Sequence, residues 1–448
     1  MAHRSCAADD PHHAADELFR ARLENMLDMR HPLVRVSHVM PWDGLIAAIG
    51  HALPGVPEGA GRRPLPARLV IGLLYLKHAY DLSDEALCER WLENPYFQYF
   101  CGEVVFQTRL PCDPSSLTRY RQRLGEEGVE ELLSQTIAAA QKMKAVNRSD
   151  LKRVVVDSTV QEKNVAHPTD SRLLEVARCK LVEAAQEENI ALRQSYRRVA
   201  PHLARQAGRY AHARQYKRMR RVIKKQRTIV GRLIRDIERK ASPEARERMA
   251  SVLARAERLR TQQRKDKNKL YAWHAPEVEC ISKGKARQPY EFGVKVSIAI
   301  SAKKGLIVGA RSYPGNPYDG DTLADQHEQV GILTGVSPDH LLVDLGYRGR
   351  TIDGVRVLHR GKPKHLSESD WEWLKRRSAV EPVIGHLKSE HRMRRSFLKG
   401  QQGDALNAVL AAAGYNLRWL MRWIRLFCVR ILVVTWRSMS HPITSCAV

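Results

Sequence analysis

Apolar side chains recur at helical spacing over residues 66–100, in the stretch PARLVIGLLYLKHAYDLSDEALCERWLENPYFQYF. The pattern around Ser83 is typical of a helix start, and a second start is predicted at Asp113-Pro114-Ser115-Ser116. The spacing therefore predicts an all-helical N-terminal domain, which we bound at residues 1–150 and interpret as a domain for DNA binding or dimerisation.

The helix predicted after Asp113 separates its apolar and basic residues. Leu117, Tyr120 and Leu124 share one face. Three arginines are expected to lie mostly off that face and to contact DNA: Arg119, Arg121 and Arg123. The alternative is the solvated basic side of an ordinary helical bundle, and no helix-turn-helix signature decides between the two.

The pattern changes to that of a buried strand at Val154-Val155-Val156-Asp157, a β-branched run that ends in a carboxylate. A new domain is expected to begin there. The next predicted strands are residues 291–300 and 305–310, which are expected to form a β-hairpin through Lys303-Lys304-Gly305.

Residues 172–270, between these strands, are helical and basic. Ile223, Val230 and Ile237 recur at every seventh residue, and Ser242-Pro243 separates this run from a second helix. We expect an antiparallel helical hairpin that occupies residues 172–272 as an insertion after the first strand. It is interpreted as an arm that contacts DNA or a second copy of the chain, and the alternative is a solvated helical pair.

The remaining elements complete an α/β pattern. They are a helix over residues 322–333, a strand over 340–343, a strand over 354–359 and a helix over 370–388. The order strand, hairpin, helix, strand, strand, helix predicts a ribonuclease-H-like α/β domain, a mixed sheet flanked by helices, over residues 151–426. Residues 427–448 are assigned to a C-terminal tail.

The charge of the chain indicates its partner. The 448 residues include 75 Lys and Arg against 49 Asp and Glu, and the net charge of +26 favours a polyanion through counterion release. Residues 197–240 alone hold 16 Lys or Arg against Asp236 and Glu238. Double-stranded DNA is the expected partner, and a ribosome-associated or membrane-surface protein is the alternative.

Cysteine usage and hydropathy indicate a cytoplasmic location, and with DNA as the expected partner the protein is expected to associate with the bacterial nucleoid. The eight cysteines include no Cys-x-x-Cys pair, as expected of reduced thiols. The N-terminal sequence MAHRSCAADDPHHAADE lacks the apolar stretch of a secretory signal. Four arginines interrupt the most apolar segment, residues 405–436, so no transmembrane helix is expected: Arg418, Arg422, Arg425 and Arg430.

Two aspartates are placed for metal-dependent chemistry. Asp157 and Asp344 each close an apolar strand, and if those strands are neighbours both side chains emerge at one end of the sheet. Phosphodiester cleavage by two Mg²⁺ or Mn²⁺ ions, about 3.5 to 4 Å apart, needs such hard oxygen ligands. Taken singly, each aspartate also fits an ordinary strand exit or turn.

A third carboxylate, Glu381, is predicted on the last helix. Arg377, Glu381 and Lys388 share one helical face, where the two cations suit a phosphate backbone that crosses the active site. A neighbouring apolar stripe is expected to pack on the sheet: Val380, Ile384 and Leu387. The alternative is a plain ion pair between Arg377 and Glu381, worth about 0.3 to 0.5 kcal/mol at a surface.

Five motifs in order carry a family resemblance. They are VVVDSTV, EFGVKV, PGNPYDGDTL, VDLGYRG and RRSAVEPVIGHLKSEHRMRRSFLKG. Together they resemble bacterial insertion-sequence transposases with a DDE catalytic triad. Residues 66–140 resemble that family's N-terminal transposase domain, and residues 153 to about 425 resemble its catalytic domain.

The resemblance implies that Asp157, Asp344 and Glu381 are the catalytic, metal-binding triad. It also matches Arg377, Glu381 and Lys388 to the family signature Tyr, two residues, Arg, three residues, Glu, six residues, Lys. The tyrosine position of that signature holds Leu374. Trp371 and Trp373, which lie nearby, offer an aromatic surface for a base, although core packing is the commoner use of tryptophan.

Two further segments flank this chemistry. Asn316-Pro317-Tyr318-Asp319-Gly320-Asp321 is interpreted as a turn in which Asp321 caps the next helix, in preference to a metal site. Tyr347, Arg348 and Arg350 follow the second aspartate and are expected to bind DNA phosphates, with a plain surface loop as the alternative.

The expected function is therefore that of a DNA transposase. Metal-activated water would cleave each transposon end, and the freed 3′-hydroxyl would attack target DNA without ATP, consistent with the absence of a P-loop motif. Two ends must be held together, so a homodimer or larger assembly is expected. The alternatives are a ribonuclease-H-like nuclease or resolvase without strand transfer, and an inactive DNA-binding derivative of a transposase.

Overall fold

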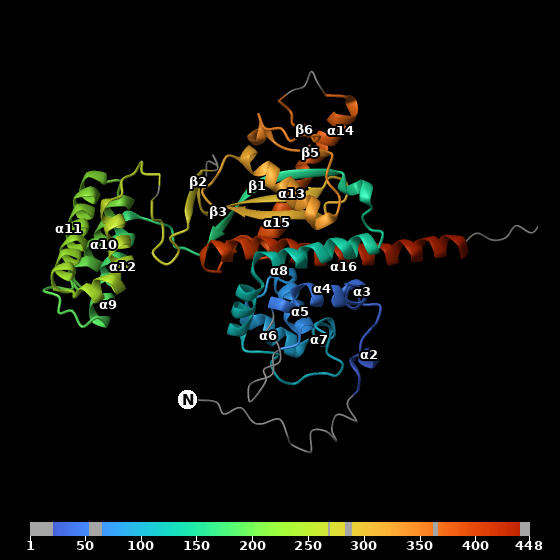
Figure 1. Cartoon of the computed structure of the whole chain (residues 1–448), viewed down its shortest axis with the longest axis horizontal. Helices are drawn as coiled ribbons and strands as arrows, with labels where there is room; N and C mark the ends of the chain where they lie inside the picture. The colour runs from blue at the N-terminus through green and yellow to red at the C-terminus, as the bar shows by residue number, and fades with distance from the viewer. Residues whose placement is uncertain (1–20, 53–64, 268, 283–288, 362–365, 440–448) are drawn as a thin grey trace, which may run out of the picture.

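The computed structural model describes residues 21–52, 65–267, 269–282, 289–361 and 366–439 (Figure 1). The predictions made for the extreme N-terminus and for residues 440–448 fall outside these ranges, as do those for Cys6 and Cys446. No helix within the described ranges combines the length and the apolar character needed to cross a membrane.

The N-terminal region is helical, as predicted. Its helices are α2 (Leu23–Met26), α3 (Pro32–Val39), α4 (Trp42–Ile49), α5 (Ala67–Ala79), α6 (Asp84–Glu93), α7 (Pro95–Phe100) and α8 (Pro114–Lys142). Both predicted starts are confirmed, because Ser83 accepts the Ala86 N–H at α6 and Asp113 accepts the Ser115 N–H at α8. Helix α8 bends at Gly125, whose φ of 63° lies in the left-handed region that glycine tolerates best.

A mixed sheet forms the centre of the rest of the chain. Its strands are β1 (Arg153–Lys163), β2 (Glu279–Ser282), β3 (Tyr290–Ser301), β4 (Ile307–Tyr313), β5 (His340–Leu342), β6 (Arg356–Leu358) and β7 (Arg395–Ser396). The order is β2-β3-β1-β5-β6, with β4 on β3 and β7 on β1. Strands β1, β3 and β4 are antiparallel, which confirms the hairpin, and β5 and β6 run parallel to β1.

Helix α16 (Gly400–Met439) joins the sheet to the N-terminal helices. It lies between them in Figure 1, and one hydrophobic core extends across all three. The buried Asn416 amide contacts both sides, because it bonds the backbone N–H and C=O of Ile307 on β4 and the hydroxyl of Thr136 on α8. The helix continues without a break across residue 427, where a separate tail is predicted.

The basic insertion is a bundle of four helices rather than a hairpin of two. Helices α9 (Asp170–Glu187), α10 (Val199–His212), α11 (Tyr216–Lys240) and α12 (Pro243–Thr261) enclose their own core and stand apart from the sheet in Figure 1. Buried leucines on α9 and α10 explain the difference, because two helices alone would leave the apolar sides of the others in water: Leu173, Leu174, Leu181 and Leu203.

The predicted helix over residues 370–388 is interrupted. It consists of α14 (Glu368–Arg376), a 3-10 turn (Arg377–Ala379) and α15 (Val380–Glu390). Pro382 explains the break. In the interior of a continuous helix its ring would clash with the backbone carbonyl four residues earlier, whereas proline is tolerated in the first turn of a new helix. Helix α13 (Leu323–Thr334) confirms the helix predicted over residues 322–333, and it packs on β3 and β4 of the hairpin.

Candidate catalytic centre and basic groove

Asp157 and Asp344 come together at one point of the sheet. Val155 of β1 pairs with Leu342 of β5 in parallel register, so two further residues along each strand bring Asp157 beside Asp344. Neighbouring strands lie about 4.8 Å apart, and residues at equal register point to the same face. Asp344 also accepts the Gly346 N–H at 2.8 Å, which orients its carboxylate.

Glu381 reaches the same site through Arg377. One guanidinium nitrogen lies 3.6 Å from Asp157 Oδ2, and another lies 3.4 Å from Glu381 Oε1. The Glu381 side chain is 63% exposed, whereas that of Asp157 is 17% exposed. The ion pair considered for Arg377 and Glu381 is therefore present, and Arg377 extends it to a carboxylate on β1.

The apolar side of α15 explains how Glu381 is held. Val380, Val383 and Leu387 are buried, and Ile384 packs against the same core while half-buried. This confirms the predicted stripe, with Val383 as an additional member. Lys388 follows Leu387 on α15 and is also half-buried.

Tyr347 is not the surface residue predicted from the sequence. Its side chain is fully buried, so it cannot contact a DNA phosphate, and the prediction for Tyr347 is wrong. Burial raises the pKa of its hydroxyl well above the usual value, and the charges of Asp319, Asp157 and Asp344 raise it further. The phenol therefore stays protonated among three carboxylates.

Arg348 and Arg350 are exposed beside this site, as a DNA-contacting role requires. Arg350 already pairs with Asp321, with 2.8 Å between Arg350 Nε and Asp321 Oδ1. Asp321 does not cap α13 as predicted, because the residue at the cap is Thr322 and no side chain accepts a hydrogen bond there. Asp321 instead lies in a 3-10 turn (Asp319–Thr322).

Sequence reasoning missed Lys295. This lysine lies in β3 with only 10% of its side chain exposed, and its ammonium is 2.8 Å from Asp319 Oδ1. A buried lysine requires a partner charge, because desolvation of a lone ammonium is costly. The signal was present in the sequence, where Lys295 is the one charged residue in the run VKVSIAI.

The donor set fits hard divalent cations in its chemistry, since every candidate ligand is a carboxylate oxygen. The side chains lie in a looser arrangement than a coordination shell. Among the residues that the structure describes, no group of three or more His, Cys, Asp or Glu side chains is close enough to hold a metal ion. Arg377, a cation, lies between Asp157 and Glu381 instead.

Leu374 and the two tryptophans of α14 differ in how far they are buried. Leu374, at the signature tyrosine position, is fully buried on α14 and packs in the main core. Trp373 is half-buried with the Arg153 guanidinium 4.9 Å from its ring centre, and Trp371 is 36% exposed. Trp371 is thus the more accessible of the two to a base.

Arg121 has a structural role, which corrects its prediction as a DNA contact. Its side chain is 2% exposed and forms a bidentate pair with Asp84 at 2.6 and 2.8 Å. Lys77 contacts the same carboxylate at 2.6 Å. Arg119 and Arg123 of α8 are exposed and remain predicted DNA contacts.

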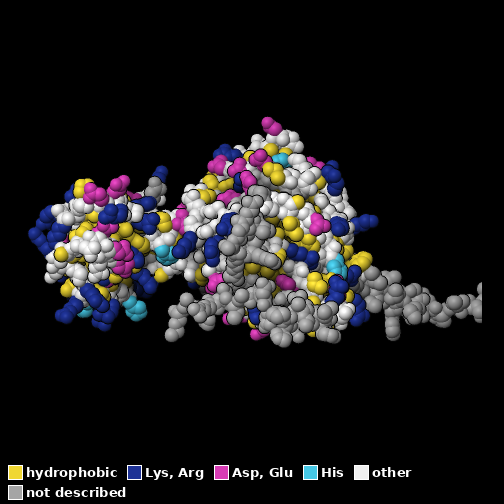
Figure 2. Space-filling model, turned by 60° about the horizontal axis from the view of Figure 1, so that its bottom comes forward, with side chains coloured by type: hydrophobic (Ala, Val, Ile, Leu, Met, Phe, Trp, Pro, Cys, Tyr) yellow, Lys and Arg dark blue, Asp and Glu magenta, His cyan; other side chains and the backbone are white. Residues whose placement is uncertain are grey.

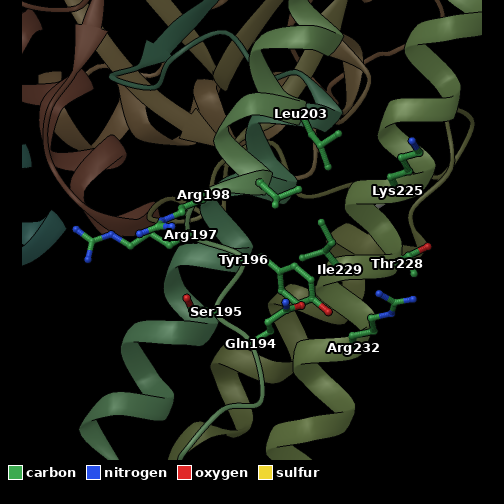
Figure 3. Close-up of a pocket in the computed structure, with 11 residues that line it drawn as sticks. Gln194, Ser195, Tyr196, Arg197, Arg198, Leu203, Lys225, Thr228, Ile229 and Arg232 are labelled. Carbon is green, nitrogen blue, oxygen red and sulfur yellow. The ribbon is translucent and has the colours of Figure 1, made fainter.

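A basic groove lies on the helical insertion. Seven residues define it: Lys225, Arg232, Arg235 and Arg239 of α11, and Arg193, Arg197 and Arg198 of the segment before α10. Its largest hollow has a volume of about 1040 Å³. In Figure 3, Tyr196 lies between Arg197 and Arg198 on one side and Lys225 and Arg232 on the other. Figure 2 shows many Lys and Arg side chains over this unit.

Helix periodicity explains the groove. Lys225, Arg232 and Arg239 are seven residues apart, so they repeat about every 10.5 Å along one side of α11. The opposite wall is fixed by Asp236, which accepts the Arg193 N–H at 2.8 Å and is 3.2 Å from the Lys240 ammonium. Arg193, Arg197 and Arg198 are exposed.

Comparison with known proteins identifies the family. Residues 21–123 match a family model described as Transposase domain (DUF772), and residues 256–417 match one described as Transposase DDE domain. Both models describe transposases. The chain belongs to the insertion-sequence DDE transposases. Asp344 and Glu381 lie inside the second matched segment, whereas Asp157 lies between the two, separated from its strand neighbours by the insertion.

A relative of unassigned function covers less of the chain. A protein of Rhizobium meliloti, described as uncharacterized protein ORF8 in nfe locus, is 47% identical over 206 residues, which are 46% of this chain and 98% of that protein. No solved structure matches the chain significantly.

Proposed function

We propose that this transposase cleaves the ends of its insertion sequence by metal-dependent phosphodiester hydrolysis and joins the 3′-hydroxyl ends to target DNA. The observations that support the proposal are the strand register that brings Asp157 beside Asp344 and the contacts of Arg377 with both Asp157 and Glu381. The fold proposed for residues 151–426 is ribonuclease-H-like. The order β4-β3-β1-β5-β6, with three antiparallel strands followed by two parallel to β1, supports it.

The proposed cofactor is a pair of Mg²⁺ or Mn²⁺ ions held by the three carboxylates. Such ions would activate water and neutralise charge on the reacting phosphate. A divalent cation attracts the carboxylates of Asp157 and Glu381 more strongly than the single charge of Arg377 does. Arg377 would therefore be displaced from the two carboxylates and would be free to contact the phosphate backbone. Lys388, Arg348 and Arg350 are proposed to position the backbone through charge-assisted hydrogen bonds.

DNA is proposed to bind along the basic groove as well as at the catalytic centre. The spacing of cations on α11 supports contacts to successive phosphates, and Tyr196 offers a ring on which a base can stack. Arg119 and Arg123 of α8 are proposed as further phosphate contacts. Because two transposon ends must be held at once, the working assembly is proposed to be a homodimer or larger, located in the cytoplasm with the bacterial nucleoid.

An assay with the two end sequences and a supercoiled target tests the function. With Mg²⁺ we expect nicked or released ends followed by joined products, measured on sequencing gels. Cleavage without joining would instead identify a ribonuclease-H-like nuclease or resolvase. Binding without cleavage in Mg²⁺ and in Mn²⁺ would identify an inactive derivative of a transposase.

Removing one groove cation should weaken DNA binding mainly through electrostatics. For Arg232→Ala we expect the slope of log affinity against log salt to fall by about one, the value for one lost phosphate contact. The measurement is fluorescence anisotropy with end-sequence duplex between low and physiological salt.

Lys180→Ala is the matched control for this measurement. Lys180 is also a cation of the insertion, but it lies on α9 outside the groove and pairs with Glu183 at 2.6 Å. Equal slopes for Arg232→Ala and the unchanged protein would remove the groove from the DNA-binding surface.

A further inference from the structure

Asp319 lies against the catalytic centre rather than apart from it. The backbone of Gly346 passes between Asp344 and Asp319 so closely that a side chain there would meet both carboxylates. A Cβ on Gly346 would be 2.9 Å from Asp344 Oδ1 and 3.0 Å from Asp319 Oδ2. Two carboxylate oxygens thus face each other across a residue that has no side chain.

The two oxygens of Asp319 have different surroundings. Oδ1 is 2.8 Å from the ammonium of Lys295, which also donates to the carbonyl of Pro317. Lys295 is buried in β3 next to β1, so its contact holds the Asp319 carboxylate in a fixed position relative to the sheet. Oδ2 is the oxygen on the side of Asp344.

A second, independent observation comes from Tyr347. Its side chain is fully buried, and its hydroxyl interacts with the buried hydroxyl of Ser297 on β3. Asp319, Asp157 and Asp344 all act electrostatically on that hydroxyl, so it lies within a shared acidic environment.

Three carboxylates share this environment. Asp157, Asp319 and Asp344 all act on the Tyr347 hydroxyl, while Lys295 contacts Asp319 and Arg377 contacts Asp157. Like charges at close range repel each other strongly when they are partly shielded from water. A divalent cation relieves that repulsion, so carboxylates held together by the fold favour cation binding.

We propose that Asp319 is a fourth carboxylate of the catalytic centre, fixed by Lys295 so that its Oδ2 takes part with Asp344 in binding divalent cations. This inference rests on the proposed function, because it assumes that Asp157, Asp344 and Glu381 bind metal. It differs from the interpretation of residues 316–321 as a turn alone. In that interpretation Asp319 would serve only as the counter-ion of Lys295.

The 3-10 turn supplies a matched pair of variants. Asp319 and Asp321 are two residues apart in the same turn, and each pairs with one cation. Asp321, however, pairs with the exposed Arg350, and the atoms nearest to a Cβ on Gly346 belong to Asp344 and Asp319. Asp319→Asn and Asp321→Asn therefore make the same chemical change at neighbouring positions, only one of which faces Asp344.

The test is a Mn²⁺ titration of the full chain by calorimetry, without DNA. We expect Asp319→Asn to weaken Mn²⁺ binding by about ten-fold or more, the scale seen when a group around a metal is lost. Asp321→Asn should bind Mn²⁺ within about two-fold of the unchanged protein, as expected for a substitution outside the ligand sphere. Equal affinities for the two variants would overturn the proposal.

A double variant tests whether Asp319 binds cations itself or only neutralises the charge of Lys295. Lys295→Met with Asp319→Asn removes both charges of the pair, so no lone ammonium is left to unfold the protein. We expect it to remain folded and to bind Mn²⁺ as weakly as Asp319→Asn. Restored affinity in the double variant would show that Asp319 acts only as a counter-ion.

Asp344→Asn in the same titration distinguishes this inference from the proposed function. If Asp344→Asn loses Mn²⁺ affinity and Asp319→Asn does not, only the fourth carboxylate is rejected. If neither substitution changes Mn²⁺ binding, the proposed metal-dependent centre itself fails.

Discussion

Asp157→Asn, Asp344→Asn and Glu381→Gln should each lower DNA cleavage by about 10³-fold or more, while DNA affinity stays within about two-fold. Each substitution removes one negative charge without changing side-chain size, so the interaction lost would be the proposed one with the cations and the reacting phosphate. The measurement combines single-turnover cleavage of an end-sequence duplex with anisotropy binding of the same duplex.

Asp321→Asn serves as the matched control for these three variants. It removes the charge of a carboxylate beside the site that pairs only with Arg350. We expect this variant to cleave at nearly the unchanged rate. Cleavage near the unchanged rate in Asp157→Asn, Asp344→Asn or Glu381→Gln would remove that residue from the proposed catalytic triad.

Asp84→Ala should destabilise the fold by about 3 to 5 kcal/mol, the cost typical of a buried pair that loses one partner. The substitution leaves Arg121 and Lys77 buried without their shared counter-ion. The measurement is urea unfolding followed by circular dichroism. Arg119→Ala, an exposed substitution on the same helix as Arg121, should change stability by no more than about 0.5 kcal/mol. A similar small loss for Asp84→Ala would contradict this account of Arg121.

Asp84 also makes the stability of the fold depend on pH in a predictable direction. Burial raises the pKa of Asp84, but the hydrogen bonds and charges of Arg121 and Lys77 outweigh it and lower the pKa to about 2 from 3.8. Burial, followed by the charge of Arg121, lowers the pKa of Lys77 to about 8 against the opposing effect of Asp84. The stability that Asp84 contributes is therefore present above pH 3.8 and is lost as the pH falls toward 2.

The candidate catalytic carboxylates could be proposed from sequence because each follows an apolar run. The prediction that Asp157 ends its strand is wrong, because β1 continues past it to Lys163. Asp157 and Asp344 each follow an apolar run, and a parallel pairing of those runs was enough to bring them together. The break before Glu381 was also accessible, since Pro382 disfavours a continuous helix. The structure adds that Arg377 at the break contacts carboxylates from both elements.

Other features depended on packing between distant segments. Arg121 is four residues after Leu117 and three before Leu124, so it shares their buried face. That Asp84 of α6 packs against this face and pairs with Arg121 is evident only from the folded structure. The proximity of Asp319 to Asp344 likewise requires two loops to meet at Gly346. The insertion needed four helices because each of its apolar faces had to be covered by another.

The length and continuity of α16 set a mechanical limit on this transposase. Forty residues of helix span about 60 Å, and the Asn416 amide pins its middle to α8 and to β4 at once. The N-terminal helices and the sheet therefore cannot slide or hinge past each other without breaking buried hydrogen bonds. If α8 binds the duplex, the distance between that contact and the acidic centre would be fixed. The rigid connection through α16 would then determine how far from the contact the DNA is cut.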